Sequence, residues 1–181
     1  MRRFSALSLS AFSVLAAALV GCTNSTDYNG NSTTAVTEIT AGENPLSVGE
    51  QVVFYFDFEF DENDVFSGSG EVNLVVVVPP QLSYVLNTSE ISGLSGDDTP
   101  VIPYVTRCLN GFTYLQFNLN DTDLQDSYSP SGDAEAQLTM TLVGRQDSDY
   151  VVVEASALDG YIAFGCNQDF VADETDIVQV F

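Results

Sequence analysis

The feature that most constrains the fold is a large apolar side chain at every second position over residues 52–61. The apolar positions are Val52, Phe54, Phe56, Phe58 and Phe60. The intervening and following positions are Val53, Tyr55, Asp57, Glu59 and Asp61, of which the last three are acidic. Successive side chains of a β-strand point to opposite faces, so this pattern places the aromatic rings on one face and the acids on the other. Residues 52–61 therefore predict a strand with one face buried and one face in water.

Further short apolar and β-branched runs follow, each bounded by turn sequences rich in Gly, Pro, Asn or Asp. We expect strands at 71–78, 82–87, 101–107, 112–119, 136–143, 150–158, 161–165 and 176–181. No segment keeps an apolar repeat at helical spacing. Many short strands at this spacing predict an all-β fold, a single antiparallel Ig-like β-sandwich domain over residues 35–181.

The predicted core follows from the same alternation. It should contain the apolar face of residues 52–61 together with Leu74, Val76, Val78, Leu115, Phe117, Leu138, Met140, Leu142, Val151 and Val153. The chain is 45% hydrophobic and carries 12 Phe and 8 Tyr, which is enough to bury a sizeable core in spite of its many acids.

The N-terminus has the layout of a secretory signal, with two arginines, a stretch of apolar and small residues interrupted by serines, and Gly21 before Cys22. Residues 19–22 (LVGC) resemble the lipobox of bacterial lipoproteins. The resemblance implies removal of residues 1–21 and lipid attachment to the Cys22 thiol, and Thr23 in place of Asp implies the outer membrane. Residues 22–34 are small and polar and predict a flexible tether. The alternative is an ordinary secretory signal with a cysteine at its end by chance.

The mature chain is strongly acidic. It carries all 26 acids against Arg107 and Arg145, a formal charge of −24, and the whole chain has no Lys or His. Such a surface repels phosphate backbones, which excludes nucleic acid as a partner. It also repels anionic lipid headgroups, so membrane attachment depends on the lipid. The charge could attract cations or a basic partner, or it could serve only solubility in a salty medium.

Two cysteines remain if Cys22 carries lipid. An exported protein occupies a compartment where disulfides persist, so Cys108 and Cys166 are expected to form one bridge. The alternative is a pair of buried free thiols.

The composition argues against an enzyme. Without His or Lys, histidine-based nucleophilic systems, histidine metal sites and lysine chemistry are impossible. One oxygen-rich cluster could hold calcium: Asn118, Asn120, Asp121, Asp123 and Asp126. The alternative is that these side chains cap turns in water. Seven tyrosines could likewise line a binding surface, for a carbohydrate for example, or simply fill strand faces.

Residues 47–56 and 75–85 are similar to the first strands of the Ig-like repeat domain of bacterial surface proteins, and residues 134–143 are similar to its strand before the last hairpin. The chain departs from that family in its cysteine pair, its single copy and its aspartates. The resemblance implies a spacer or adhesion module without catalytic residues. We therefore expect a lipid-anchored, non-enzymatic interaction or structural module that meets an envelope protein or polymer; the alternative is a calcium- or carbohydrate-binding module.

Overall fold

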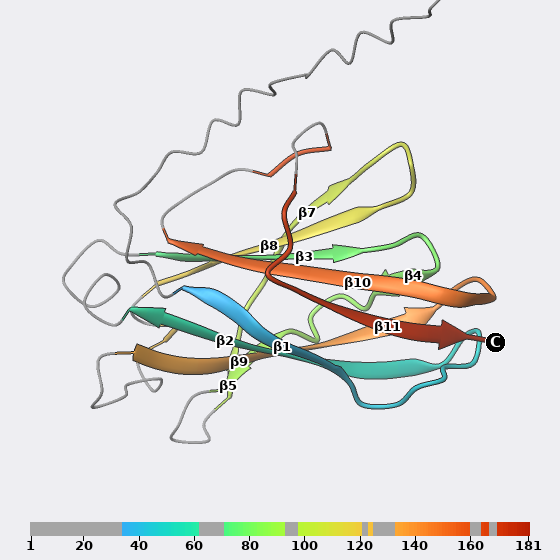
Figure 1. Ribbon diagram of the computed structural model, residues 1–181, viewed down its shortest axis with the longest axis horizontal. Helices are drawn as coiled ribbons and strands as arrows, with labels where there is room; N and C mark the ends of the chain where they lie inside the picture. The colour runs from blue at the N-terminus through green and yellow to red at the C-terminus, as the bar shows by residue number, and fades with distance from the viewer. Residues whose placement is uncertain are drawn as a thin grey trace, which may run out of the picture. The chain divides into compact units, whose positions relative to one another are not determined.

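The computed structural model describes residues 34–61, 71–92, 98–120, 123–124, 133–159, 164–166 and 170–181. In this part of the chain the strands form two antiparallel sheets that pack face to face (Figure 1). The prediction of an all-β sandwich is confirmed.

Sheet A has the strand order β1-β2-β9-β5-β6, and β4 also pairs with β9. Its strands are β1 (Ala35–Ala41), β2 (Gln51–Asp61), β4 (Leu82–Tyr84), β5 (Glu90–Ser92), β6 (Asp98–Pro100) and β9 (Asp133–Gly144). The longest pairing joins β2 to β9, from Gln51 opposite Val143 to Asp61 opposite Asp133, without a register shift. These two strands therefore form the rigid centre of the sheet.

Sheet B has the strand order β11-β10-β3-β8-β7. Its strands are β3 (Val72–Val78), β7 (Tyr104–Arg107), β8 (Thr113–Leu119), β10 (Ser148–Asp159) and β11 (Glu174–Val180). The sheet is built around β3, which pairs with β10 on one side and β8 on the other.

The core lies between the sheets and matches the predicted set. Phe54, Phe56, Phe58 and Phe60 of β2 are each at most 1% exposed. All ten further residues predicted for the core are buried as well. Alternation along β2 thus reports correctly which face of the strand meets the other sheet.

One side of the sandwich is closed by backbone hydrogen bonds across the sheets. The segment before β2 runs beside β11, where Leu46 N donates to Gln179 O and Phe181 N donates to Leu46 O, each at 2.8 Å. Farther along the same side, the Asp173 carboxylate accepts the N–H of Val36 in sheet A at 3.1 Å. The same oxygen accepts the N–H of Ala157 in sheet B at 2.8 Å. The outer edge of β11 is therefore paired.

Strand β3 is buried on both faces. Its inner face meets the core, and its outer face includes Val75 and Val77, which are at most 2% exposed. The connection from β10 to β11 passes over this side of sheet B, because Phe164 N donates to Gln116 Oε1 on β8 at 3.1 Å. A strand covered on both sides needs apolar residues at successive positions, as the valine run of β3 provides.

Several strand predictions need correction. The sequence does not predict β1, β5 or β6. The strand expected at 82–87 ends at Tyr84, because the chain turns and Asn87 adopts a left-handed φ of 61°. The strand expected at 161–165 is wrong at Phe164 and Gly165, which lie outside any strand because Phe164 bonds to a side chain instead of a neighbouring strand; residues 161–163 lie outside the described residues.

Candidate functional site

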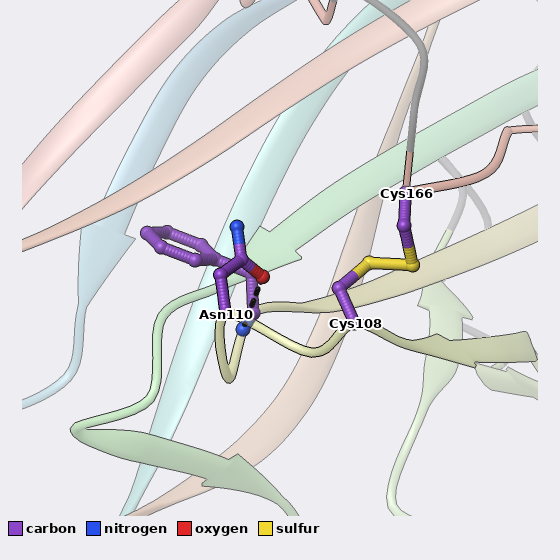
Figure 2. The surroundings of a disulfide bond; sticks show 4 residues. Cys108, Asn110 and Cys166 are labelled. Atoms are coloured by element: carbon purple, nitrogen blue, oxygen red, sulfur yellow. Dashed lines mark hydrogen bonds between the residues drawn. A yellow bond between two sulfur atoms is a disulfide. The ribbon is translucent and has the colours of Figure 1, made fainter.

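The disulfide joins the end of β7 to the β10–β11 connection. Cys108 and Cys166 are bonded with an S–S distance of 2.02 Å and a Cα–Cα distance of 5.4 Å, across 58 positions of sequence (Figure 2). Cys108 begins the turn between β7 and β8, where Gly111 N donates to Cys108 O at 3.0 Å. The predicted bridge is confirmed, and it ties the connection to the outer strand of sheet B.

Aromatic rings hold the same connection against the sheet. Phe170 packs edge-on against Tyr114 of β8, with ring centroids 6.1 Å apart. Phe164 packs edge-on against Phe170 with centroids 5.8 Å apart. Because the disulfide and these rings act on one short stretch of chain, they form a covalent and an apolar attachment of the connection to sheet B.

The residues predicted to bind calcium begin with Asn118 in β8 and continue in the segment after it. Asn118 is the acceptor for Gln116 Nε2 at 3.2 Å. Asn120 and Asp123 cap one another's backbone, with Asn120 N donating to Asp123 Oδ2 at 3.0 Å and Asp123 N donating to Asn120 Oδ1 at 3.2 Å. This is the turn-capping arrangement that the sequence left open as the alternative. Asp121 and Asp126 lie outside the described residues, so calcium binding at this segment stays a prediction.

Sheet A carries an acidic hollow of about 460 Å³ on the face that points away from the core. Its lining residues are Thr37, Glu38, Asp57, Phe58, Glu59, Ser92, Glu135, Ala136 and Gln137. They come from β2, β9, β1 and β5, so the hollow spans four strands. None of these lining residues is basic.

The strand register explains how the acids come together. Glu38 lies opposite Asp57, and Asp57 lies opposite Gln137, whose Nε2 donates to Asp57 Oδ1 at 2.7 Å. In the next row Glu59 lies directly opposite Glu135. Like charges at opposed positions of neighbouring strands destabilise a sheet. The hollow is therefore a site of concentrated negative charge that the fold tolerates.

The hollow lacks the geometry of a preformed metal centre. Among the residues that the structure describes, no three His, Cys, Asp or Glu side chains are grouped to hold a metal ion. The sequence does not predict the hollow, although the alternation over residues 52–61 places Asp57 and Glu59 on the wet face of their strand. The other lining residues come from separate strands, and the register that aligns them cannot be obtained from a single strand's pattern.

The tyrosines that the structure describes do not form one platform. Tyr104 on β7 and Tyr150 on β10 are exposed, but β3 and β8 separate their strands in sheet B. Tyr55, Tyr84 and Tyr114 are half-buried. The remaining two of the seven, Tyr128 and Tyr161, lie outside the described residues.

The predicted lipid-attachment residue, Cys22, also lies outside the described residues. Within the described ranges, no helix is long and apolar enough to cross a membrane.

No protein-family model matches the sequence, and no curated protein matches it. Solved structures do share its fold. The Corynebacterium diphtheriae major pilin SpaA is 15% identical with a TM-score of 0.55, over 82% of this chain and 37% of the pilin. This chain thus spans little more than a third of the pilin's length.

Two other structures are similar at lower TM-scores. The collagen-binding domain of a Staphylococcus aureus adhesin is 9% identical with a TM-score of 0.41, over 84% of this chain and 99% of that domain. AvmM, which catalyses macrocyclization in alchivemycin A biosynthesis, is 11% identical with a TM-score of 0.43, over 83% of this chain and 89% of AvmM. From the pilin similarity and its own two sheets, this chain has a β-sandwich fold like that of part of a Gram-positive pilin.

Proposed function

We propose that the protein is a non-enzymatic interaction or structural module of the bacterial cell surface, held to an envelope membrane by lipid on Cys22. The observation that carries the proposal is the fold similarity to a major pilin, which extends over 82% of this chain. The structure of that pilin points to a modular pilus assembly. A sandwich of this kind serves as a rigid body that presents its edges and loops to a partner.

The disulfide supports an address outside the cytoplasm. Cytoplasmic thiols are kept reduced, whereas bridges persist in exported proteins. The bond between Cys108 and Cys166 therefore agrees with the secretory signal predicted at residues 1–21. The formal charge of −24 makes electrostatic binding to anionic lipid unfavourable, so a covalent lipid is the anchor that the chemistry allows.

The covalent reinforcement of this chain differs from that of the pilin. The pilus assembly of SpaA has stabilising isopeptide bonds. A side-chain isopeptide bond needs a lysine amine, and this chain has no Lys. The disulfide thus serves as the covalent cross-link in this sandwich.

Lipid anchoring can be tested by replacing the modified residue. In cells that export the full chain, the wild-type protein should partition into detergent with the membranes, and its N-terminal peptide should carry the mass of a diacylglyceryl cysteine. The Cys22→Ser variant should lose both properties. A double variant, Cys108→Ser with Cys166→Ser, is the matched control, because it replaces the two other cysteines and should keep the lipid. An unmodified Cys22 in the wild-type protein would contradict the anchor.

The interaction role needs a separate measurement. Cross-linking on intact cells should join the wild-type protein to the same envelope component in repeated experiments. The Cys22→Ser variant should lose that product, because it is no longer held at the membrane. Recovery of the uncross-linked protein alone would argue against an interaction module.

A further inference from the structure

The four outer edges of the two sheets are not equally protected. In sheet B, the edge of β11 is hydrogen-bonded to Asn44 and Leu46. In sheet A, the β1 edge is tied to Asp173 through Val36, and β6 is a three-residue strand that ends in Pro100. Strand β7, at the other edge of sheet B, has β8 as its one neighbour in the described sheet. Unpaired strand edges are templates for another strand.

The hydrogen-bond pattern identifies which groups of β7 face outward. Cys108 N donates to Phe112 O at 2.8 Å, and Arg107 lies opposite Thr113 in the register. Bonded and non-bonded pairs alternate in an antiparallel ladder. Thr106 therefore exchanges bonds with β8, whereas the N–H and C=O groups of Val105 and Arg107 point away from it.

The side chains around this edge are apolar and exposed. Ile102, just before β7, is 82% exposed, and Tyr104 at its start is 70% exposed. Leu109, in the turn after it, is fully exposed. Several large apolar side chains beside open backbone groups are the combination that strand addition uses for affinity and specificity.

The charge of this region differs from that of the rest of the chain. Residues 99–120 contain no acidic residue, although the mature chain has 26 acids, and they include Arg107, which is exposed at the β7 edge. A carboxylate in an added strand would therefore meet a guanidinium, and no acid of residues 99–120 would repel it. A second copy is a poor occupant, because each copy carries a formal charge of −24.

We infer that the β7 edge is a docking site for an extended segment of a different protein, which joins sheet B as a further strand and sets a carboxylate beside Arg107. The inference rests on the proposed function, because it specifies how the module takes its partner. The added strand bonds to Val105 and Arg107 through the backbone and covers Ile102, Tyr104 and Leu109.

The test uses the mature protein in detergent and two synthetic peptides of alternating Val and Thr with soluble ends. One peptide has a central Glu, and the other has a central Lys. With the Glu peptide at saturation, amide hydrogen exchange at Val105 and Arg107 should slow by about tenfold or more. The Lys peptide should protect both amides less. Protection at neither amide, or equal protection by both peptides, would overturn the inference.

Three variants make the test specific. Arg107→Pro removes an outward N–H without touching the β8 ladder, so it should abolish peptide binding and leave the melting temperature nearly unchanged. Arg107→Ala keeps that N–H and should bind both peptides alike. Thr106→Pro removes an N–H that bonds to β8 and should lower the melting temperature. Full binding by Arg107→Pro, or an unchanged melting temperature for Thr106→Pro, would overturn the assignment of the edge.

Cross-linking on cells separates this inference from the proposed function. Loss of the cross-linked product in Arg107→Pro would support docking at β7. If wild type and Arg107→Pro give the same product, the module has a partner but binds it elsewhere, and the β7 inference fails while the proposed function stands.

Discussion

Asp173 connects the two sheets through a single carboxylate oxygen. That oxygen accepts an N–H from β1 and another from β10. Hydrogen bonds to a charged group are stronger than neutral ones, and both partners are backbone groups that an apolar replacement would leave unpaired. One short side chain thus links β1 of sheet A to β10 of sheet B, two strands that do not pair with each other in either sheet.

Replacing this residue should loosen the joint. Asp173→Ala should lower the free energy of unfolding by about 1–3 kcal/mol, measured by denaturant titration. Asp173→Asn keeps an acceptor oxygen and should lose less than Asp173→Ala. Asp149→Ala, at an exposed position of β10, is a control that should change stability little. An Asp173→Ala protein as stable as the control would contradict the role of the joint.

Substitutions at two glycines distinguish the free-energy cost of backbone strain from the cost of a steric clash. Gly49 and Gly111 both have positive φ, at 91° and 89°. A Cβ on Gly111 would lie 2.9 Å from Pro80 Cβ, whereas a Cβ on Gly49 would meet no atom within 4 Å. Gly49→Ala should therefore cost about 1–2 kcal/mol from the left-handed backbone alone. Gly111→Ala should cost at least about 1 kcal/mol more from overpacking. Equal losses in thermal unfolding would mean that Pro80 moves aside freely.

At the scale of elements, the disulfide and the aromatic rings hold the β10–β11 connection against sheet B. Replacing both Cys108 and Cys166 by Ser should lower the free energy of unfolding by about 2–5 kcal/mol. Amide exchange should also rise at Val75 and Val77, whose outward side chains lose their cover. An unchanged unfolding curve would show that the rings hold the connection by themselves.

The end of β8 and the segment after it provide a test of the predicted calcium site. If Asn118, Asn120, Asp121, Asp123 and Asp126 bind calcium, millimolar calcium should raise the melting temperature more than magnesium does, because a ligand that binds the folded state stabilises it. Asp123→Asn should reduce that rise. The same melting temperature with either ion would leave Asn120 and Asp123 as caps of a turn.

The sequence predicts strands best where burial alternates over a long run. The apolar face of β2 could be identified because five large side chains repeat at every second position. Strands β5 and β6 could not be identified, since each has only three residues. Strand β5 is defined by its pairing with β9, and β6 by its pairing with β5. Strand β1 could not be predicted because it does not alternate: its two buried residues, Val36 and Ile39, are three positions apart, with a register shift between Val36 and Glu38. Its place is set by β2 and Asp173.

The candidate sites also differ in whether the sequence alone could predict them. The disulfide could be predicted from cysteine arithmetic, because only two thiols remain after Cys22 is assigned to lipid. The acidic hollow and the open β7 edge could not, since both depend on which strands are neighbours. Composition indicates that a chain is acidic, and only the register shows that Glu59 faces Glu135.

At the scale of the whole molecule, the formal charge of −24 should make stability depend on salt. Raising sodium chloride from about 0.01 M to about 1 M shortens the screening distance from about 30 Å to about 3 Å. Self-repulsion then falls, and the melting temperature should rise. Each kcal/mol gained corresponds to about 2–4 °C for a domain of this size. Potassium chloride should act like sodium chloride, and a flat response would mean that the charges are already well separated.

The bond between Val36 and Asp173 spans 137 positions of sequence. The first described strand of the sandwich is thus completed by a residue that is synthesised much later than the strand itself. Contacts this distant in sequence slow folding, since a long loop must close before they form. Early in synthesis the chain has β1 and β2 without the residues that seal them. The hydrogen-bonded link between the two sheets therefore cannot form until Asp173 has been synthesised.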